Sequence, residues 1–239
     1  SSSGAGYYNE GDTLALTVTF SEEVTVTGTP TLTLETGLTD AVANYTSGSA
    51  STVLTFRYIV ASGNNSSDLD YASTTALALN SGTIADAAGN NANLTLAEPA
   101  AANSLGSNKA LIIDSATPTI SAVTSTTTDG SYKSGDAVAI TITFSEAVTV
   151  TGIPQLTLET GTTDAVVDYA SGSGGTTLTF SYTIGSGDNS NDLGYASTSA
   201  LALNNGTIFD AAGNPATLTL AEPGAANSLS TSKSLIIDT

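Results

Sequence analysis

The chain of 239 residues contains no cysteine, histidine, methionine or tryptophan. Without cysteine there are no disulfides and no thiolate chemistry, and without imidazole or thiolate groups the usual ligands of zinc and copper are missing. The common catalytic triads are excluded for the same reason. A pair of carboxylates that hydrolyses glycosides is the one catalytic arrangement left open. We therefore expect the protein not to be an enzyme.

Positive charge and long apolar runs are also scarce. Only four residues are lysine or arginine, against 22 that are aspartate or glutamate, and the net charge is −18. Nucleic-acid affinity comes largely from cations that neutralise phosphates, so we predict no nucleic-acid partner. No apolar run approaches the ~18 residues of a membrane span, and we expect no membrane insertion. The sequence does not open with a signal-peptide pattern, and we expect the chain to be a piece of a longer protein.

The chain does contain a tandem repeat. The string Phe20-Ser21-Glu22 returns at residues 144–146 and Leu111–Asp114 returns at residues 235–238, both at an offset of 124 residues. A unit of that length can bury its own core. The repeat predicts two domains, 1–114 and 115–239. Residues 1–9 match 125–133, so any strand formed by residues 115–124 would have no counterpart in the first domain.

Each copy has the patterning of short strands. Residues 13–20 and 137–144 alternate apolar with small or polar side chains, which is typical of a strand with one buried face. Seven or eight such strands per copy, separated by glycine-rich turns and without helical periodicity, predict an all-β fold of two tandem immunoglobulin-like antiparallel β-sandwich domains. Tyr71 and Tyr195 fit either tyrosine corners or half-buried strand tyrosines.

Several strings occur in both copies: GDxxxxxxxFSE, PxLTLETG, an SGS turn before LTFxY, DAAGN and the closing LIID. Together they resemble immunoglobulin-like repeats that form long arrays in giant bacterial surface adhesins, often of the RTX type. The resemblance implies calcium-binding extender modules of a secreted protein at the bacterial cell surface. The calcium-binding nonapeptide repeat of RTX proteins is absent, so these residues would belong to the extender.

The acidic composition also indicates calcium, which takes six to eight oxygen ligands from carboxylates, amides, carbonyls and water. Counting strand directions from one end of a sandwich to the other predicts which acids meet. Asp114, with Asp68 and Asp70 of the first domain, is expected to face Glu146, Asp210 and Asn214 of the second, with calcium between them.

Other oxygen-bearing residues are weaker candidates, each with an alternative. Glu22, like Glu146, fits a ligand or a solvated turn acid. Asp86 and Asn90 of the first DAAGN loop, like Asp210 and Asn214, fit ligands or a turn that bonds its own backbone. Asp188 and Asp192 begin a segment that resembles an EF-hand loop but has Leu193 where glycine is required. Asp238 repeats Asp114, whereas Asp12 and Asp136 are expected to be turn residues.

These observations predict a monomeric spacer whose partners are neighbouring repeats of the same chain. Three residues separate Asp114 from Pro118, so the joint is short, and bound calcium would hold it straight. The alternative is a module that binds carbohydrate or ice through a threonine-rich sheet face. Threonine also suits solvent-facing strand positions in general, and aromatic residues, the usual carbohydrate platforms, make up only 6% of the chain.

Overall fold

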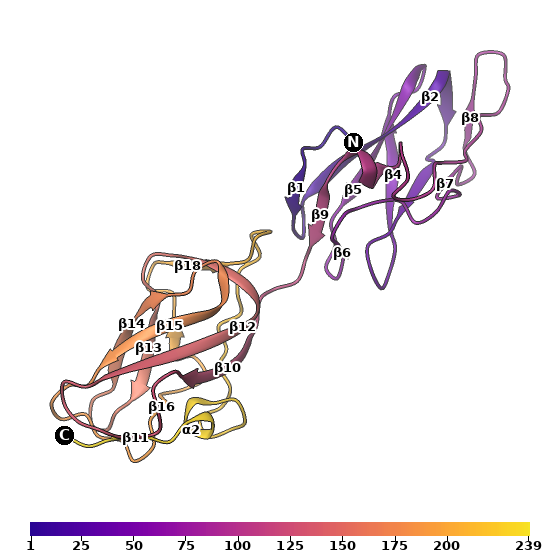
Figure 1. Ribbon diagram of the computed structural model, residues 1–239. Coiled ribbons are helices and arrows are strands. Elements are labelled where there is room, and N and C mark those ends of the chain that lie inside the picture. Colours follow the sequence, from indigo (N-terminus) through magenta and orange to yellow (C-terminus); the bar gives the residue numbers. More distant parts are fainter. The chain divides into compact units, whose positions relative to one another are not determined.

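The computed structural model describes residues 1–239 and divides into two compact units, Ser1–Ala116 and Thr117–Thr239 (Figure 1). The boundary lies two residues after the one expected from the repeat. Strands dominate both units, so the all-β class is confirmed. No helix has the length and apolar character needed to cross a membrane.

The first unit is built on a six-stranded antiparallel sheet. In spatial order its strands are β7 (Leu77–Ala78), β3 (Thr31–Leu34), β4 (Ala41–Ser47), β5 (Ser51–Ile59), β2 (Thr13–Thr27) and β8 (Thr83–Ala85). The alternation seen in the sequence places Leu14 and Leu16 of β2 in the core, at 0% and 1% exposure. Leu54 and Phe56 of β5 are fully buried beside them.

A second, three-stranded sheet completes the first unit. It contains β1 (Gly6–Tyr8), β9 (Leu111–Asp114) and β6 (Asn65–Ser66), with β9 in the middle. Leu111 and Ile113 of β9 belong to the same buried cluster as Leu16 and Phe56. The core therefore lies between the two sheets, as in a β-sandwich. A single helical turn, α1 (Leu105–Asn108), precedes β9.

The second unit repeats this plan with one additional strand. Its main sheet contains β10 (Ile120–Ser125), β12 (Ala137–Thr151), β15 (Gly175–Thr183), β14 (Ala165–Ser171), β13 (Gln155–Glu159) and β16 (Gly194–Tyr195), in that spatial order, while β17 (Leu201–Ala202) pairs with β13 and β18 (Thr207–Phe209) with β12. β11 (Gly130–Tyr132) pairs with β19 (Leu235–Ile237), and α2 (Leu229–Ser232) precedes β19. The strand β10 has no counterpart on the matching edge of β2 in the first unit.

Three features differ from the expected antiparallel sandwich. β1 runs parallel to β9, and β11 parallel to β19, so a short strand near the start of each unit pairs in parallel with the strand that ends it. The units contain nine and ten strands rather than seven or eight, and each has a four-residue helix, too short to show helical periodicity. The long strands β2 and β12 continue past residues 20 and 144, where the sequence predicted that they end.

Continuation of β2 requires a break in its register. The strand pairs with β5 up to Thr19, shifts register before Val24, and then pairs with β8 through Thr25–Thr27. Strict alternation would place Glu22 on the buried face with Leu16 and Val24, and the irregularity leaves it exposed to solvent instead. β12 shifts register in the same way between Thr143 and Val148.

The two equivalent tyrosines of the repeat, Tyr71 and Tyr195, are not tyrosine corners. Their exposed fractions are 6% for Tyr71 and 2% for Tyr195. Each hydroxyl donates at 2.7 Å to a carbonyl 26 residues further along the chain, that of Ala97 or Ala221, whereas a tyrosine corner bonds back to the backbone a few residues upstream. These tyrosines instead fasten the long loop that precedes each short helix to the main sheet.

Candidate metal site

In the first unit, an acidic pocket forms where β2 changes partner. Its volume is about 350 Å³, and Glu22, Asp86 and Asn90 lie on its wall. The sheet pairing explains why they meet: Thr25 of β2 is opposite Ala85 of β8, so Asp86, the next residue, emerges beside the irregular segment that carries Glu22.

The loop of residues 86–90 is held by Asp86. Its carboxylate accepts hydrogen bonds from the backbone N–H of Ala88 and of Asn90, at 2.9 and 2.8 Å, and from the Asn90 amide at 2.7 Å. The bonds from the side chain and backbone of Asn90 lower the pKa of Asp86. The turn-forming role considered for this residue is therefore present, and the carboxylate keeps its charge beside Glu22.

The second unit has the same arrangement, with its aspartate more deeply buried. Asp210 follows β18, whose Phe209 is opposite Thr149 of β12, and Glu146 lies in the irregular segment of β12. Glu146 and Asp210 each offer a carboxylate oxygen within 4.8 Å of the other. Asp210 also accepts hydrogen bonds from the backbone and the side-chain amide of Asn214, both at 2.8 Å, and Asp210 and Asn214 are each 6% exposed.

This set of donors suits a hard cation. A carboxylate oxygen has two lone pairs, so Asp210 can bond Asn214 and still accept from another partner. Two carboxylates at this spacing repel each other unless a cation, a proton or a donor lies between them. Calcium and magnesium prefer oxygen ligands, and the acidic groups here supply oxygen without any nitrogen or sulfur ligand.

The start of the second unit is fixed next to this pair. The Thr119 N–H donates to Ser145 Oγ at 3.0 Å, and the Ser145 N–H donates to the Thr119 carbonyl at 2.7 Å. On the other side, the Thr217 N–H donates to the Pro118 carbonyl at 2.8 Å. Pro118 and Thr119 are thus anchored beside the residue that precedes Glu146.

Asp68 and Asp70, which were expected to lie beside Asp114, lie towards the opposite end of β9. Asp114 ends the strand opposite Asn65, and its carboxylate accepts from the Ala116 N–H at 3.0 Å. The chain after Asn65 runs antiparallel to β9, so that Leu69 donates to the Leu111 carbonyl at the other end of the strand. The prediction that Asp68 and Asp70 lie at the same pole as Asp114 is therefore wrong.

Asp188 also has a structural partner. Its carboxylate accepts from the Tyr182 hydroxyl at 2.7 Å and from the Gly185 N–H at 2.8 Å. Asn64 does the same in the first unit, where it accepts from Tyr58 and Ala61, both at 3.0 Å. Burial, together with the bond to Asp188 and its charge, raises the pKa of Tyr182. Asp188 thus closes a turn over a buried tyrosine.

The remaining candidates do not gather into a cluster. Asp192 and Asp238 are exposed. No group of three acidic residues with one carboxylate oxygen each within 4.8 Å of the others includes Asp68, Asp70, Asp188, Asp192 or Asp238. An EF-hand-like site at residues 188–192 therefore gains no support from the structure. Asp12 and Asp136 are turn residues as expected, each accepting from the backbone N–H three residues earlier.

Sequence reasoning missed the structural role of Asp70. The residue is 8% exposed, and its carboxylate accepts from the backbone N–H groups of Tyr71, Ala100 and Leu105 at 2.9, 2.9 and 3.1 Å. Burial raises its pKa, but hydrogen bonds from Ala100, Ser104, Tyr71 and Gly106 outweigh it, and the net pKa is lowered. The one available signal was that the repeat replaces Asp70 with Gly194.

The change Asp70→Asn is expected to destabilise the first unit by about 1–3 kcal/mol at pH 7. The backbone N–H groups bond both carboxylate oxygens of Asp70, and the asparagine amide has only one acceptor oxygen. A lowered folded-state pKa contributes stability that is present above the ordinary aspartate pKa of about 4 and is lost as pH falls through the folded value. Thermal melts at several pH values should show the wild-type first unit weakening below about pH 4, and the variant weakening less steeply. Asp68→Asn, at an exposed neighbour, is the control. Equal melts for wild type and Asp70→Asn at pH 7 would contradict the assigned role.

Comparison of the chain with protein-family models and with curated proteins finds no match.

Proposed function

We propose that the chain is a pair of immunoglobulin-like extender repeats of a bacterial cell-surface adhesin, stiffened by calcium, which project a distal binding domain away from the cell. The observation that carries this proposal is the pairing of Glu146 with Asp210, together with the same residue types, Glu22 and Asp86, around one pocket of the first unit. If each joint of a repeat array binds calcium, every repeat must carry the same acidic pair at the same point of its fold, and both units do.

The calcium ligands in the second unit would be the carboxylates of Glu146 and Asp210, the amide oxygen of Asn214 and water. Asp114 supplies the third carboxylate under this proposal. Three residues separate Asp114 from Pro118, and the four residue-to-residue steps between them span at most ~14 Å. Pro118 is anchored beside Ser145, so the proposal requires only that this short connection bring Asp114 to Glu146.

An ion held by residues on both sides of a short connection would limit its bending. Without calcium, the carboxylates repel one another and the joint is free to move within the limits of the short connection. With calcium, the same groups become ligands and the joint is locked. In an array of repeats, Asp238 would serve the next joint as Asp114 serves this one.

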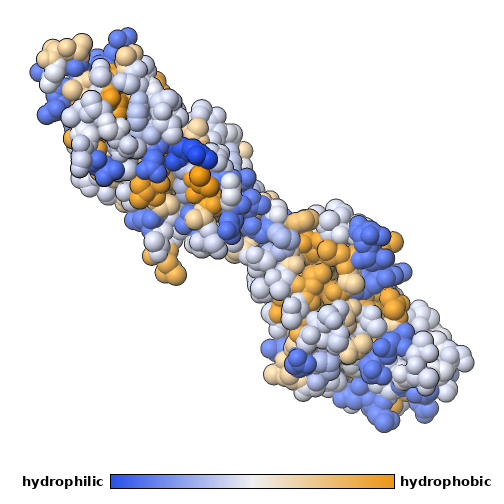
Figure 2. Space-filling model, turned by 180° about the vertical axis from the view of Figure 1, so that it is seen from behind, coloured by the Kyte–Doolittle hydropathy of each residue, from blue (hydrophilic) through white to orange (hydrophobic).

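The surface supports a spacer more than a carbohydrate-binding module. Figure 2 shows patches of hydrophobic residues on one face of both units among neutral and hydrophilic ones. Of the large hydrophobic residues that are exposed, Tyr7 is the only aromatic one, at 51% exposure. Carbohydrate sites usually present aromatic platforms to stack against sugars, and a single exposed tyrosine is a poor platform.

A calcium titration tests the proposal. Extracellular calcium modules bind at about 10⁻⁴–10⁻³ M, and an ion at 100 times its Kd adds about 2.7 kcal/mol of stability. We expect calorimetric binding heat in the millimolar range, a higher melting temperature, and a longer particle by small-angle X-ray scattering. Asp114→Ala and Glu146→Gln should each weaken binding, whereas the exposed Asp192→Asn should not. Absence of binding heat at 10 mM calcium, or equal weakening by Asp192→Asn, would overturn the proposal.

A further inference from the structure

Each unit joins a strand near its start to the strand that ends it through one parallel pair. Residues 6–8 of β1 lie opposite residues 111–113 of β9 (Figure 1), and residues 130–132 of β11 lie opposite residues 235–237 of β19. In a parallel pair, the first residue of one strand and the last residue of the other lie at opposite ends. Tension applied to those two residues therefore pulls the strands past each other along their own axes.

Hydrogen bonds close both ends of the pair in the second unit. The Gly130 N–H donates to the Ser234 carbonyl at 3.0 Å, and the Asp238 N–H donates to the Tyr132 carbonyl at 3.0 Å. In the first unit, the Gly6 N–H donates at 3.0 Å to the carbonyl of the residue before β9. Such bonds lie across the direction of sliding, so tension along the strands strains all of them together. A pair that is opened from one end loses the same bonds one after another.

The last strand of the second unit is also held on its other side. Ile237 exchanges two hydrogen bonds with Ser190, at 2.8 and 2.9 Å, and the Leu193 N–H donates to the Leu235 carbonyl at 2.8 Å. The side chains of Leu235 and Ile237 are 0% and 2% exposed. β19 can therefore slide only if it leaves the core and breaks pairing on both of its edges.

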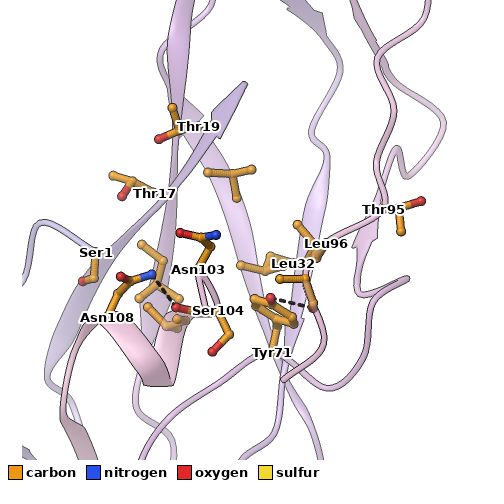
Figure 3. Close-up of a pocket in the computed structure, with 14 residues that line it drawn as sticks. Ser1, Thr17, Thr19, Leu32, Tyr71, Thr95, Leu96, Asn103, Ser104 and Asn108 are labelled. Carbon is orange, nitrogen blue, oxygen red and sulfur yellow. Dashed lines mark hydrogen bonds between the residues drawn. The ribbon is translucent and has the colours of Figure 1, made fainter. Parts of the chain in front are cut away.

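In the first unit, the segment that leads into β9 is fastened as well. Asn108 of α1 donates from its side-chain amide to the Ser104 carbonyl at 2.7 Å, and Ser104 itself is fully buried (Figure 3). Earlier in the same segment, the Ala97 carbonyl accepts the hydrogen bond from the Tyr71 hydroxyl (Figure 3). These bonds keep the segment from lengthening under tension, so β9 is held at its start.

We propose that the parallel pair in each unit, β1 with β9 and β11 with β19, is a mechanical clamp that makes the unit resist tension along the chain. Resistance to force is set by the barrier to unfolding rather than by the free energy of unfolding. The clamp raises this barrier because its bonds must break together before the strands can separate. It needs no metal and is separate from the acidic pair, so it does not depend on the proposed calcium site.

The test compares two directions of pull on the clamp of the second unit in the full chain. Since the chain has no cysteine, one introduced cysteine gives a unique attachment point. Thr126→Cys and Ser134→Cys place it at exposed positions before and after β11, and the second attachment follows Thr239 in both proteins. A pull from residue 126 shears β11 against β19 without loading β10, whereas a pull from residue 134 peels the pair from one end.

Single-molecule force spectroscopy in a calcium chelator measures the unfolding force. We expect the force from residue 126 to be about three times that from residue 134, because three residue pairs resist together in one case and singly in the other. The chelator makes this outcome independent of the calcium proposal. Equal forces in the two directions would overturn the clamp.

A pair of variants at one residue tests the hydrogen bond itself. Asp238→Pro removes the N–H that bonds Tyr132, while Asp238→Ala removes the same carboxylate and keeps the N–H. The proline should lower the force from residue 126 about 1.5-fold or more relative to the alanine, because one of few cross-strand bonds is lost. Equal forces for the two variants would contradict the assignment.

A core variant separates the clamp from general stability. Val167 is buried in β14, outside the parallel pair. Val167→Ala should lower the melting temperature of the second unit but leave the force from residue 126 unchanged. If it lowered that force as much as Asp238→Pro does, loss of overall stability would explain the result and the clamp would be refuted.

Discussion

Replacing Phe56 with alanine is expected to destabilise the first unit by about 3–5 kcal/mol and to leave unfolding of the second unit unchanged. Phe56 lies at the centre of β5 with 0% exposure and packs edge-on against Tyr45, with ring centroids 6.0 Å apart. Its removal leaves a cavity that the surrounding sheet cannot fully close. The effect should stay local because the buried cores of the two units form separate clusters.

Calorimetry of the full chain checks this prediction. At about 4 °C per kcal/mol, the transition of the first unit should move down by about 12–20 °C. Phe180→Ala is the matched change in the second unit, where Phe180 is equally buried and packs against Tyr169 at 6.1 Å. It should move the other transition instead. A single transition that shifts equally for both variants would show that the units unfold together, contrary to the two-core description.

The core could be predicted from the sequence because it depends on a periodicity of two. Leu14 and Leu16, and their counterparts Val138 and Ile140, were expected on one face and are all buried. The offset of 124 residues carried each assignment from one copy to the other. Strand pairing was harder to predict from the sequence. The parallel pairing of β1 with β9 joins segments about 100 residues apart, and such a pairing leaves no local sequence pattern.

The candidate metal site could be predicted only in part. The argument from strand directions put Glu146 and Asp210 at one pole of the second unit, and their oxygens do approach each other. The same argument misplaced Asp68 and Asp70, because it did not foresee that the chain after β6 runs back along β9. It also missed that Asp188 closes a turn against Tyr182, since such a contact depends on the fold rather than on residue spacing.

The additional strand of the second unit illustrates a different limit. The sequence indicated that residues 115–124 have no counterpart in the first copy as given, but not where in the sheet they lie. That required knowing that β10 pairs with β12 and that Val123 is buried. An internal repeat thus serves as a reference structure within one molecule.

Gly172→Ala is expected to cost the second unit about 3–5 kcal/mol, through backbone strain and overpacking combined. Gly172 joins β14 to β15 with φ of 111°, and a Cβ there would lie 2.1 Å from the Thr177 carbonyl oxygen and 3.0 Å from Leu178 Cα. Both obstacles are backbone atoms of the adjoining strand, so no side-chain rotation relieves the clash. Gly48 has the same conformation and a 2.1 Å obstacle in the first unit, and this explains why both copies have glycine there.

The control lies two residues further along the same turn. Gly174 also has positive φ, at 87°, but a Cβ there would meet nothing within 4 Å, and its counterpart in the first unit is Ala50, already at φ 61°. Gly174→Ala should therefore cost about 1–2 kcal/mol at most. Urea denaturation of the two variants measures the difference. If Gly172→Ala proved no more destabilising than Gly174→Ala, the close approach of the Thr177 carbonyl could not be what requires glycine, and backbone conformation alone would have to account for it.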